Sequence, residues 1–162
     1  MNKAVFLDRD GTLIVDKAYM HRLEDFELIS GVVPALRKFK EMGYLLIIIT
    51  NQSGIGRGYY TMEEANRFSD YVLQQLAGNQ CPIDAVYMCP HAPEEHCQCR
   101  KPSPYLIQKA ISEWNISAAE SYMFGDKDID VECGNNAGVK AYKVTEEKNL
   151  LYWVNKIANH DI

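Results

Sequence analysis

The chain has 162 residues, of which 47% are hydrophobic, with a formal net charge of −5 and five cysteines. This length predicts one domain over residues 1–162 with its own hydrophobic core, and the acidic charge argues against a broad basic surface for nucleic acid. No signal peptide and no apolar run of about 18 residues is found, so we expect a cytoplasmic protein, most simply a monomer, without a membrane or nucleic-acid partner.

Short apolar runs alternate along the chain with stretches of helical period. The expected strands are Ala4–Leu7, Leu45–Ile49, Ala85–Met88, Tyr122–Phe124 and Val139–Tyr142. The expected helices are Val32–Met42, Met62–Leu76, Tyr105–Trp114, Val131–Ala137 and Asn149–Ile157. Uninterrupted apolar strands are typical of parallel sheets that are covered on both faces. This order predicts an α/β fold with a doubly wound, mostly parallel sheet and helices on both faces.

Polar residues follow three of these strands directly. Asp8 and Asp10 come after the first strand in VFLDRDGTLI, Thr50 follows the second, and Asp126 and Asp130 follow the fourth. Because ligands bind at the carboxyl edge of an open parallel sheet, we expect these side chains to meet there. Carboxylates that converge repel one another unless a hard divalent cation, most simply Mg²⁺, lies among them.

The same residue types support phosphoryl chemistry. Asp8 can attack phosphorus as a nucleophile once cations neutralise the phosphoryl oxygens. Asp10 can protonate the leaving oxygen and later activate water. The hydroxyl of Thr50 and the ammonium group of Lys101 would hold the oxygens on which charge develops. We therefore predict a phosphatase for a small phosphorylated metabolite, with these four catalytic residues.

A cysteine-rich loop, 89-CPHAPEEHCQCRKP-102, lies before the last two strands. Cys89, His91, Cys97 and Cys99 make a complete tetrahedral ligand set for Zn²⁺ with no open position, which favours a structural site over a catalytic one. The loop has 14 residues, three of them prolines, so metal binding would supply much of its folding energy. A fixed loop would also pre-position the Arg-Lys pair that follows it.

Four segments, DRDGT, TNQSG, CRKP and GDKDID, resemble in this order the signature motifs of the haloacid-dehalogenase-like phosphatases. The resemblance runs from the first predicted strand to the last. It implies a phosphoric monoester hydrolase that forms an aspartyl-phosphate on Asp8, with Asp10 as general acid and base. It also implies a Mg²⁺ site of Asp8, Asp10 and Asp126, with Asp130 as a possible further ligand. Asp128 lies nearby and could compete for that last role.

Within this family, the zinc loop and NQSGIGRG resemble the D-glycero-D-manno-heptose 1,7-bisphosphate phosphatases. That resemblance implies removal of the 7-phosphate in nucleotide-activated heptose biosynthesis, as in lipopolysaccharide assembly. The related histidinol-phosphate phosphatases are the alternative. Only five residues separate His91 from Cys97, as in many of these enzymes, and Glu94 and Glu95 would suit a cationic substrate. Because a bisphosphate needs several cations and the chain offers them, we favour the heptose substrate.

The substrate-binding residues implied by the resemblance, with Arg57 added as a further cation for a bisphosphate, lie after the first two strands and in the last two motifs. They are Asp16, Lys17, Ala18, Tyr19, Asn51, Gln52, Ser53, Arg57, Arg100 and Lys127. The insertions Ile14–Ser30 and Ser53–Tyr60 are too short for a separate cap domain. We therefore expect an open site whose specificity comes from these loops and the zinc loop.

Overall fold

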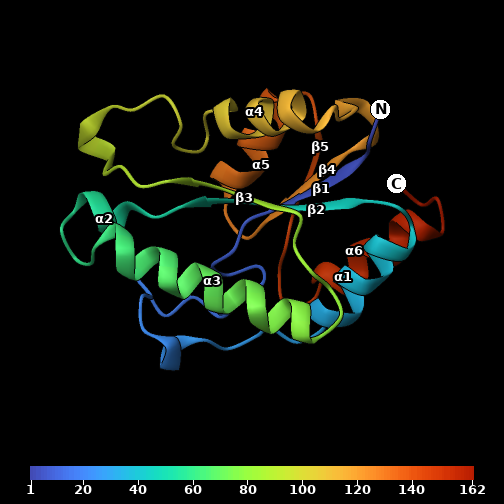
Figure 1. Cartoon of the computed structure of the whole chain (residues 1–162). Coiled ribbons are helices and arrows are strands. Elements are labelled where there is room, and N and C mark those ends of the chain that lie inside the picture. The colour runs from blue at the N-terminus through green and yellow to red at the C-terminus, as the bar shows by residue number, and fades with distance from the viewer.

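Five parallel strands form the central sheet in the computed structural model, which describes residues 1–162 (Figure 1). The strands are β1 (Ala4–Leu7), β2 (Leu45–Asn51), β3 (Ala85–Cys89), β4 (Tyr122–Gly125) and β5 (Lys140–Lys143). Their order in the sheet is β3-β2-β1-β4-β5, and every neighbouring pair is parallel. The chain thus starts at the centre of the sheet and winds outward in both directions, which confirms the doubly wound α/β fold.

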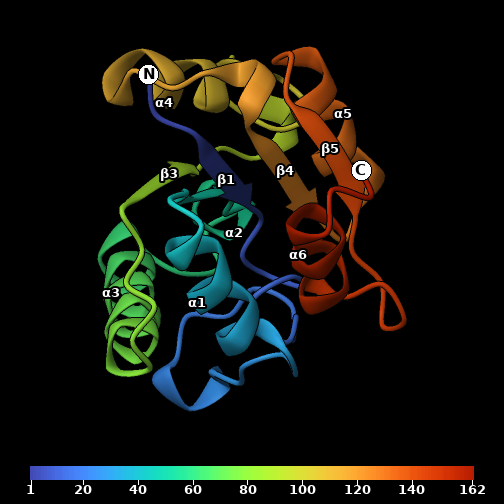
Figure 2. The ribbon, with the colours of Figure 1, turned by 90° about the vertical axis from the view of Figure 1, so that its right-hand side faces the viewer.

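Helices cover both faces of this sheet. The helices are α1 (Val32–Glu41), α2 (Ser53–Gly56), α3 (Met62–Gly78), α4 (Tyr105–Trp114), α5 (Asp128–Asn136) and α6 (Leu150–Ala158). Figure 2 shows α1, α3 and α6 on one face and α4 and α5 on the other. No cap domain is present, and none of the helices is both long and apolar enough to cross a membrane.

The central strand β1 is buried on both faces. Val5 and Leu7 belong to the larger hydrophobic cluster, beneath α1, α3 and α6, whereas Ala4 and Phe6 belong to the smaller cluster beneath α4 and α5. This alternation follows from the period of two in a β-strand. Because all four side chains are fully buried, the carboxyl end of β1 is a rigid platform for Asp8, the residue that follows.

Two helices differ most from the sequence-based expectation, whereas the others differ by at most two residues at an end. Helix α5 begins at Asp128, three residues before the predicted start, and Asp130 in its first turn accepts a hydrogen bond from the amide of Lys127 at 3.1 Å. Carboxylates in a first turn satisfy free amides and interact favourably with the helix dipole. Helix α2 was not predicted, because its four residues are too few to show a helical period.

Candidate active site

A cleft of about 320 Å³ lies at the carboxyl edge of the sheet. Nine of the ten predicted substrate-binding residues line it, as do Asp8, Asp10 and Lys101. The exception is Lys17, whose Nζ pairs with Glu27 on the surface at 3.2 Å. The four motifs therefore meet in one place, as expected from the topology. Direct contact of the nine residues with substrate stays a prediction.

Three carboxylates form a compact group in this site. One oxygen from each of Asp8, Asp126 and Asp130 lies within 4.8 Å of the others. The Oδ1 atom of Asp126 is buried without a hydrogen-bond partner. A Cβ atom on Gly11 would lie 2.2 Å from Asp126 Oδ2, and one on Gly125 would lie 2.2 Å from the Cβ of Asp130. A side chain at either glycine would therefore collide with a carboxylate of the site. An orphaned buried oxygen among these carboxylates fits a bound divalent cation.

Lys101 bridges two of the carboxylates from below. Its buried Nζ lies 2.6 Å from Asp8 Oδ1 and 2.7 Å from Asp130 Oδ1, and it donates to the carbonyl of Ile49 at 2.9 Å. Burial lowers the pKa of Lys101, but the two carboxylates more than offset this and raise it overall. The lysine is therefore a permanent positive charge at the floor of the cleft.

Asp8 is held in an environment that disfavours its charge. Burial raises its pKa from 3.8 to about 8, Asp130 adds to the rise, and Lys101 opposes it. The single positive charge of Lys101 thus does not keep all the carboxylates of this group ionised at neutral pH. A second positive charge is needed for Asp8 to be an ionised nucleophile at neutral pH.

The carboxylate of Asp10 does not belong to this group of three. It forms two hydrogen bonds with the neighbouring Arg9, from Nε at 2.7 Å and from Nη2 at 3.2 Å. The amide of Gln52 donates to it at 3.1 Å and to the hydroxyl of Thr50 at 2.8 Å. Asp130, rather than Asp10, thus contributes the third carboxylate, and the role of Asp10 as a Mg²⁺ ligand stays a prediction.

Some residues of the site could not be identified from the sequence. Arg9 is 3% exposed and its guanidinium lies 5.0 Å from the ring centroid of Phe68, so a surface role is excluded. Tyr60 lines the cleft without belonging to any motif, and Ile129 lines it from within GDKDID, where it is the apolar residue between two aspartates. Only Arg9 and Ile129 had a sequence signal, because each stands between two aspartates of a motif.

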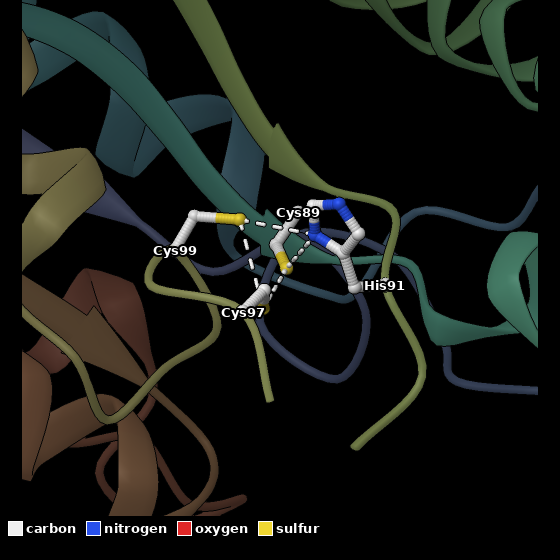
Figure 3. Close-up of side chains that lie close together, drawn as sticks. All are labelled: Cys89, His91, Cys97 and Cys99. Carbon is white, nitrogen blue, oxygen red and sulfur yellow. Dashed lines mark hydrogen bonds between the residues drawn. The ribbon is translucent and has the colours of Figure 1, made fainter. Parts of the chain in front are cut away.

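The cysteine cluster forms as predicted, with all four ligand atoms facing one point (Figure 3). Cys89 Sγ lies 3.5 Å from Cys97 Sγ, which lies 3.8 Å from Cys99 Sγ. His91 Nδ1 lies 3.5 Å from Cys89 Sγ and 3.3 Å from Cys99 Sγ. Zn–S bonds of about 2.3 Å and Zn–N bonds of about 2.0 Å put tetrahedral ligands about 3.8 and 3.5 Å apart. The spacing therefore fits a zinc ion.

The zinc loop supports the neighbouring loop that carries α2. The amide of Gly56 donates to the carbonyl of Pro90 at 2.9 Å. A Cβ atom on Gly56 would lie 2.4 Å from the amide nitrogen of Ala92 and 2.5 Å from the carboxylate of Glu95. The loop also runs directly into Arg100, which lines the cleft. Metal binding would thus fix two walls of the cleft at once.

Comparison with known proteins identifies close relatives of this chain. A family profile described as HAD-hydrolase-like matches residues 98–160. The D-glycero-beta-D-manno-heptose-1,7-bisphosphate 7-phosphatase of Helicobacter pylori is 47% identical over 140 residues, which cover 86% of this chain and 81% of the relative. The enzyme of that name from Haemophilus influenzae is 44% identical over 86% of this chain and 79% of its own length.

A solved structure agrees with this relationship. The D,D-heptose 1,7-bisphosphate phosphatase from B. bronchiseptica, crystallised with magnesium and phosphate, superposes with a TM-score of 0.89. The alignment covers 98% of this chain and 99% of that one, at 24% identity. This likeness establishes a shared fold.

Proposed function

Because the chain belongs to the haloacid-dehalogenase-like phosphatases, in the family of the heptose-1,7-bisphosphate 7-phosphatases, we propose that it removes the 7-phosphate of D-glycero-D-manno-heptose 1,7-bisphosphate. The observation that carries the choice of substrate is the charge in the cleft. Besides Lys101 at the floor, Arg57, Arg100 and Lys127 line the walls. One of the guanidinium nitrogens of Arg100 is buried without a partner. A second phosphate would satisfy it.

The reaction follows from the positions of these side chains. Asp8 attacks phosphorus, the bond from phosphorus to the sugar oxygen breaks, and Asp10 gives its proton to that oxygen. Asp10 then takes a proton from water, which attacks the aspartyl-phosphate and releases phosphate while Asp8 is regenerated. Lys101 and the hydroxyl of Thr50 stabilise the charge that develops on the phosphoryl oxygens.

We also propose that Mg²⁺ is the cofactor, held by Asp8, Asp126 and Asp130, with Asp10 as the further predicted ligand. The support is the orphaned oxygen of Asp126 and the excess of negative charge in the carboxylate group. When bound, the ion would neutralise the phosphoryl oxygens and restore the ionised form of Asp8.

Mg²⁺ is expected to stabilise the protein more at pH 8.5 than at pH 5.5. Without metal the folded-state pKa of Asp8 is raised from 3.8 to about 8, so the folded state takes up a proton that the unfolded state lacks in this window. The stability of the metal-free protein therefore falls as pH rises, and Mg²⁺ must displace that proton at low pH. Thermal unfolding with and without Mg²⁺ measures the difference. Asp126→Asn should lose the shift, and equal shifts at both pH values would contradict the assignment.

We propose that Cys89, His91, Cys97 and Cys99 hold a structural Zn²⁺. Their ligand atoms are spaced as a tetrahedral site requires, and burial raises the pKa of Cys89, so its buried thiolate requires a cation. This site lies outside the cleft and leaves no ligand position for substrate.

Loss of the zinc site is expected to raise KM for the bisphosphate at least about tenfold, because the zinc loop supports two walls of the cleft. Cys97→Ser tests this, with metal content measured by mass spectrometry and KM by phosphate release. Cys81→Ser is the matched control, since this buried thiol lies outside the cluster and donates to the carbonyl of Leu76. A Cys97→Ser protein with one zinc per chain would contradict the assignment.

Histidinol phosphate is the second candidate substrate, and the structure weakens it. Neither Glu94 nor Glu95 lines the cleft. The carboxylate of Glu95 instead accepts a hydrogen bond from the amide of Ala92 at 2.6 Å. Glu95 thus stabilises the turn of the short zinc loop, and neither glutamate offers its carboxylate to a cationic substrate in the cleft.

The substrate is tested by phosphate release from both anomers of the heptose 1,7-bisphosphate and from histidinol phosphate, with Mg²⁺ present. We expect kcat/KM for one heptose anomer to exceed that for histidinol phosphate at least about a hundredfold, because Arg57, Arg100 and Lys127 line the cleft and can bind a second phosphate. A preference for histidinol phosphate would overturn the proposal.

We propose further that this enzyme acts in the cytoplasm in heptose biosynthesis, as a single-domain monomer. All five cysteines are free of disulfides, which suits a reducing compartment. Light scattering coupled to gel filtration measures the oligomeric state.

A further inference from the structure

A buried chain of hydrogen bonds leads from Asp10 to a tyrosine outside every motif. Gln52 is 4% exposed and Tyr60 is 5% exposed. The hydroxyl of Tyr60 donates to Gln52 Oε1 at 2.8 Å, and Gln52 Nε2 donates to Asp10 Oδ2 at 3.1 Å. The second hydrogen on Nε2 is used by Thr50 Oγ1 at 2.8 Å. Both hydrogens of Gln52 Nε2 are thus engaged, and Oε1 accepts one hydrogen bond.

The orientation of this amide is dictated by its neighbours. A reversed amide would place Oε1 beside the carboxylate of Asp10, where two acceptors repel. Burial raises the pKa of Tyr60 to about 12, so its hydroxyl keeps its proton and acts as the donor to Gln52. Tyr60 therefore fixes Gln52, and Gln52 donates to Asp10 Oδ2, while Arg9 donates to both oxygens of Asp10 from the neighbouring position.

The ring of Tyr60 is itself fixed by two other segments. It stacks on His21 with centroids 5.0 Å apart and an angle of 13° between the planes. A Cβ atom on Gly54 would lie 2.2 Å from its Cε1 atom, so the ring packs directly on the backbone of α2. Tyr60 thus contacts both insertion loops, Ile14–Ser30 and Ser53–Tyr60, and it is connected to Asp10 through Gln52.

From this geometry we propose that Tyr60 and Gln52 are positioning residues that aim Asp10 at the leaving oxygen of the substrate. This inference rests on the proposed function, because it assigns Asp10 as the proton donor. It changes the role expected for Gln52, which acts through Asp10 rather than by contact with the sugar. In the first step, the transfer of the phosphoryl group to Asp8, the pair matters only where the leaving group must receive a proton.

The leaving group makes the proposal testable. A sugar alkoxide leaves only with a proton, whereas p-nitrophenolate leaves without one, and kcat/KM reports the step in which the leaving group departs. We expect Tyr60→Phe to lower kcat/KM for the heptose bisphosphate about tenfold and that for p-nitrophenyl phosphate less than about twofold. The bisphosphate loss should lie in kcat, with KM little changed.

A double-mutant cycle tests whether Tyr60 acts through the amide. Gln52→Met should show the same selective loss of kcat/KM. Adding Tyr60→Phe to it should lower kcat/KM no further, because the hydrogen bond from Gln52 to Asp10 is already lost. Tyr59→Phe is the matched control. Tyr59 is 57% exposed and meets Tyr19 edge to face, so its hydroxyl is expected to have no effect on either substrate.

Two results overturn the inference. Equal losses with both substrates in Tyr60→Phe would show a merely structural role, and additive losses in the double variant would show that Tyr60 acts independently of Gln52. Failure of the proposed function can be told apart from failure of this inference, because the wild-type protein would then release no phosphate from the bisphosphate. In that case the positioning role of Tyr60 and Gln52 fails together with the proposed function.

Discussion

Asp8→Asn is expected to abolish turnover, with kcat reduced by at least about 10⁴-fold, because an amide cannot attack phosphorus. Asp8 is the carboxylate at the end of the rigid central strand and lines the cleft. Asp130 shares Lys101 with Asp8, and it also accepts a hydrogen bond from the amide of Lys127. Phosphate release from the heptose bisphosphate and from p-nitrophenyl phosphate measures the loss.

The matched control for this variant is Asp16→Asn in the same cleft. Asp16 Oδ1 accepts a hydrogen bond from the amide of Ala18 at 2.9 Å, and an asparagine keeps that bond. We expect this control to lose less than about tenfold in kcat/KM. An Asp8→Asn protein with a native circular dichroism spectrum and more than about 1% of wild-type kcat would rule out Asp8 as the nucleophile.

Lys101→Met is expected to have the second-largest effect, on both stability and activity. The change leaves two buried carboxylates, Asp8 and Asp130, without their cation, and this costs about 3–5 kcal/mol in the metal-free protein at pH 8.5. The cost should shrink at pH 5, because the pKa of Asp8 is raised by burial and this carboxylate takes up a proton there. We also expect kcat to fall about 10²–10³-fold, because a donor to the phosphoryl oxygens is lost.

Denaturant unfolding at the two pH values and phosphate release measure these effects. Lys143→Met is the control, since it removes an ion pair with Asp128 at 3.0 Å in which both side chains are largely exposed. Loss of such an exposed ion pair is expected to leave the free energy of unfolding unchanged. If Lys101→Met and Lys143→Met unfold at the same denaturant concentration at pH 8.5, Lys101 is not the counterion of the carboxylates.

The meeting of the motifs in one cleft could be predicted because it depends on topology alone. Asp8, Thr50 and Asp126 follow or end β1, β2 and β4, and the carboxyl ends of parallel strands share an edge. The zinc cluster could be predicted from residue type and spacing, since its ligands lie within one loop. The strands are apolar runs whose limits differ from the predicted ones by a few residues at most.

The partners of Asp10 could not be predicted, because they depend on side-chain directions in loops. Tyr60 lies 50 positions from Asp10 in the sequence, in a segment with no helical or strand period. Nothing in the pattern shows that its hydroxyl turns inward while that of the adjacent Tyr59 stays in solvent. The early start of α5 escaped prediction for a related reason: its first turn consists of Asp128, Ile129 and Asp130, two of which had been assigned only to the metal site.

The close approach of Gly56 to Ala92 and Glu95 limits how this scaffold can be re-engineered. Surface loops usually accept insertions and grafts one at a time. A longer graft between His91 and Cys97 would replace the turn on which Gly56 rests, and a side chain at position 56 would collide with the existing one. The zinc loop and residues 53–60 therefore have to be transplanted together, as a single cassette, if the substrate range is to be altered without loss of the fold.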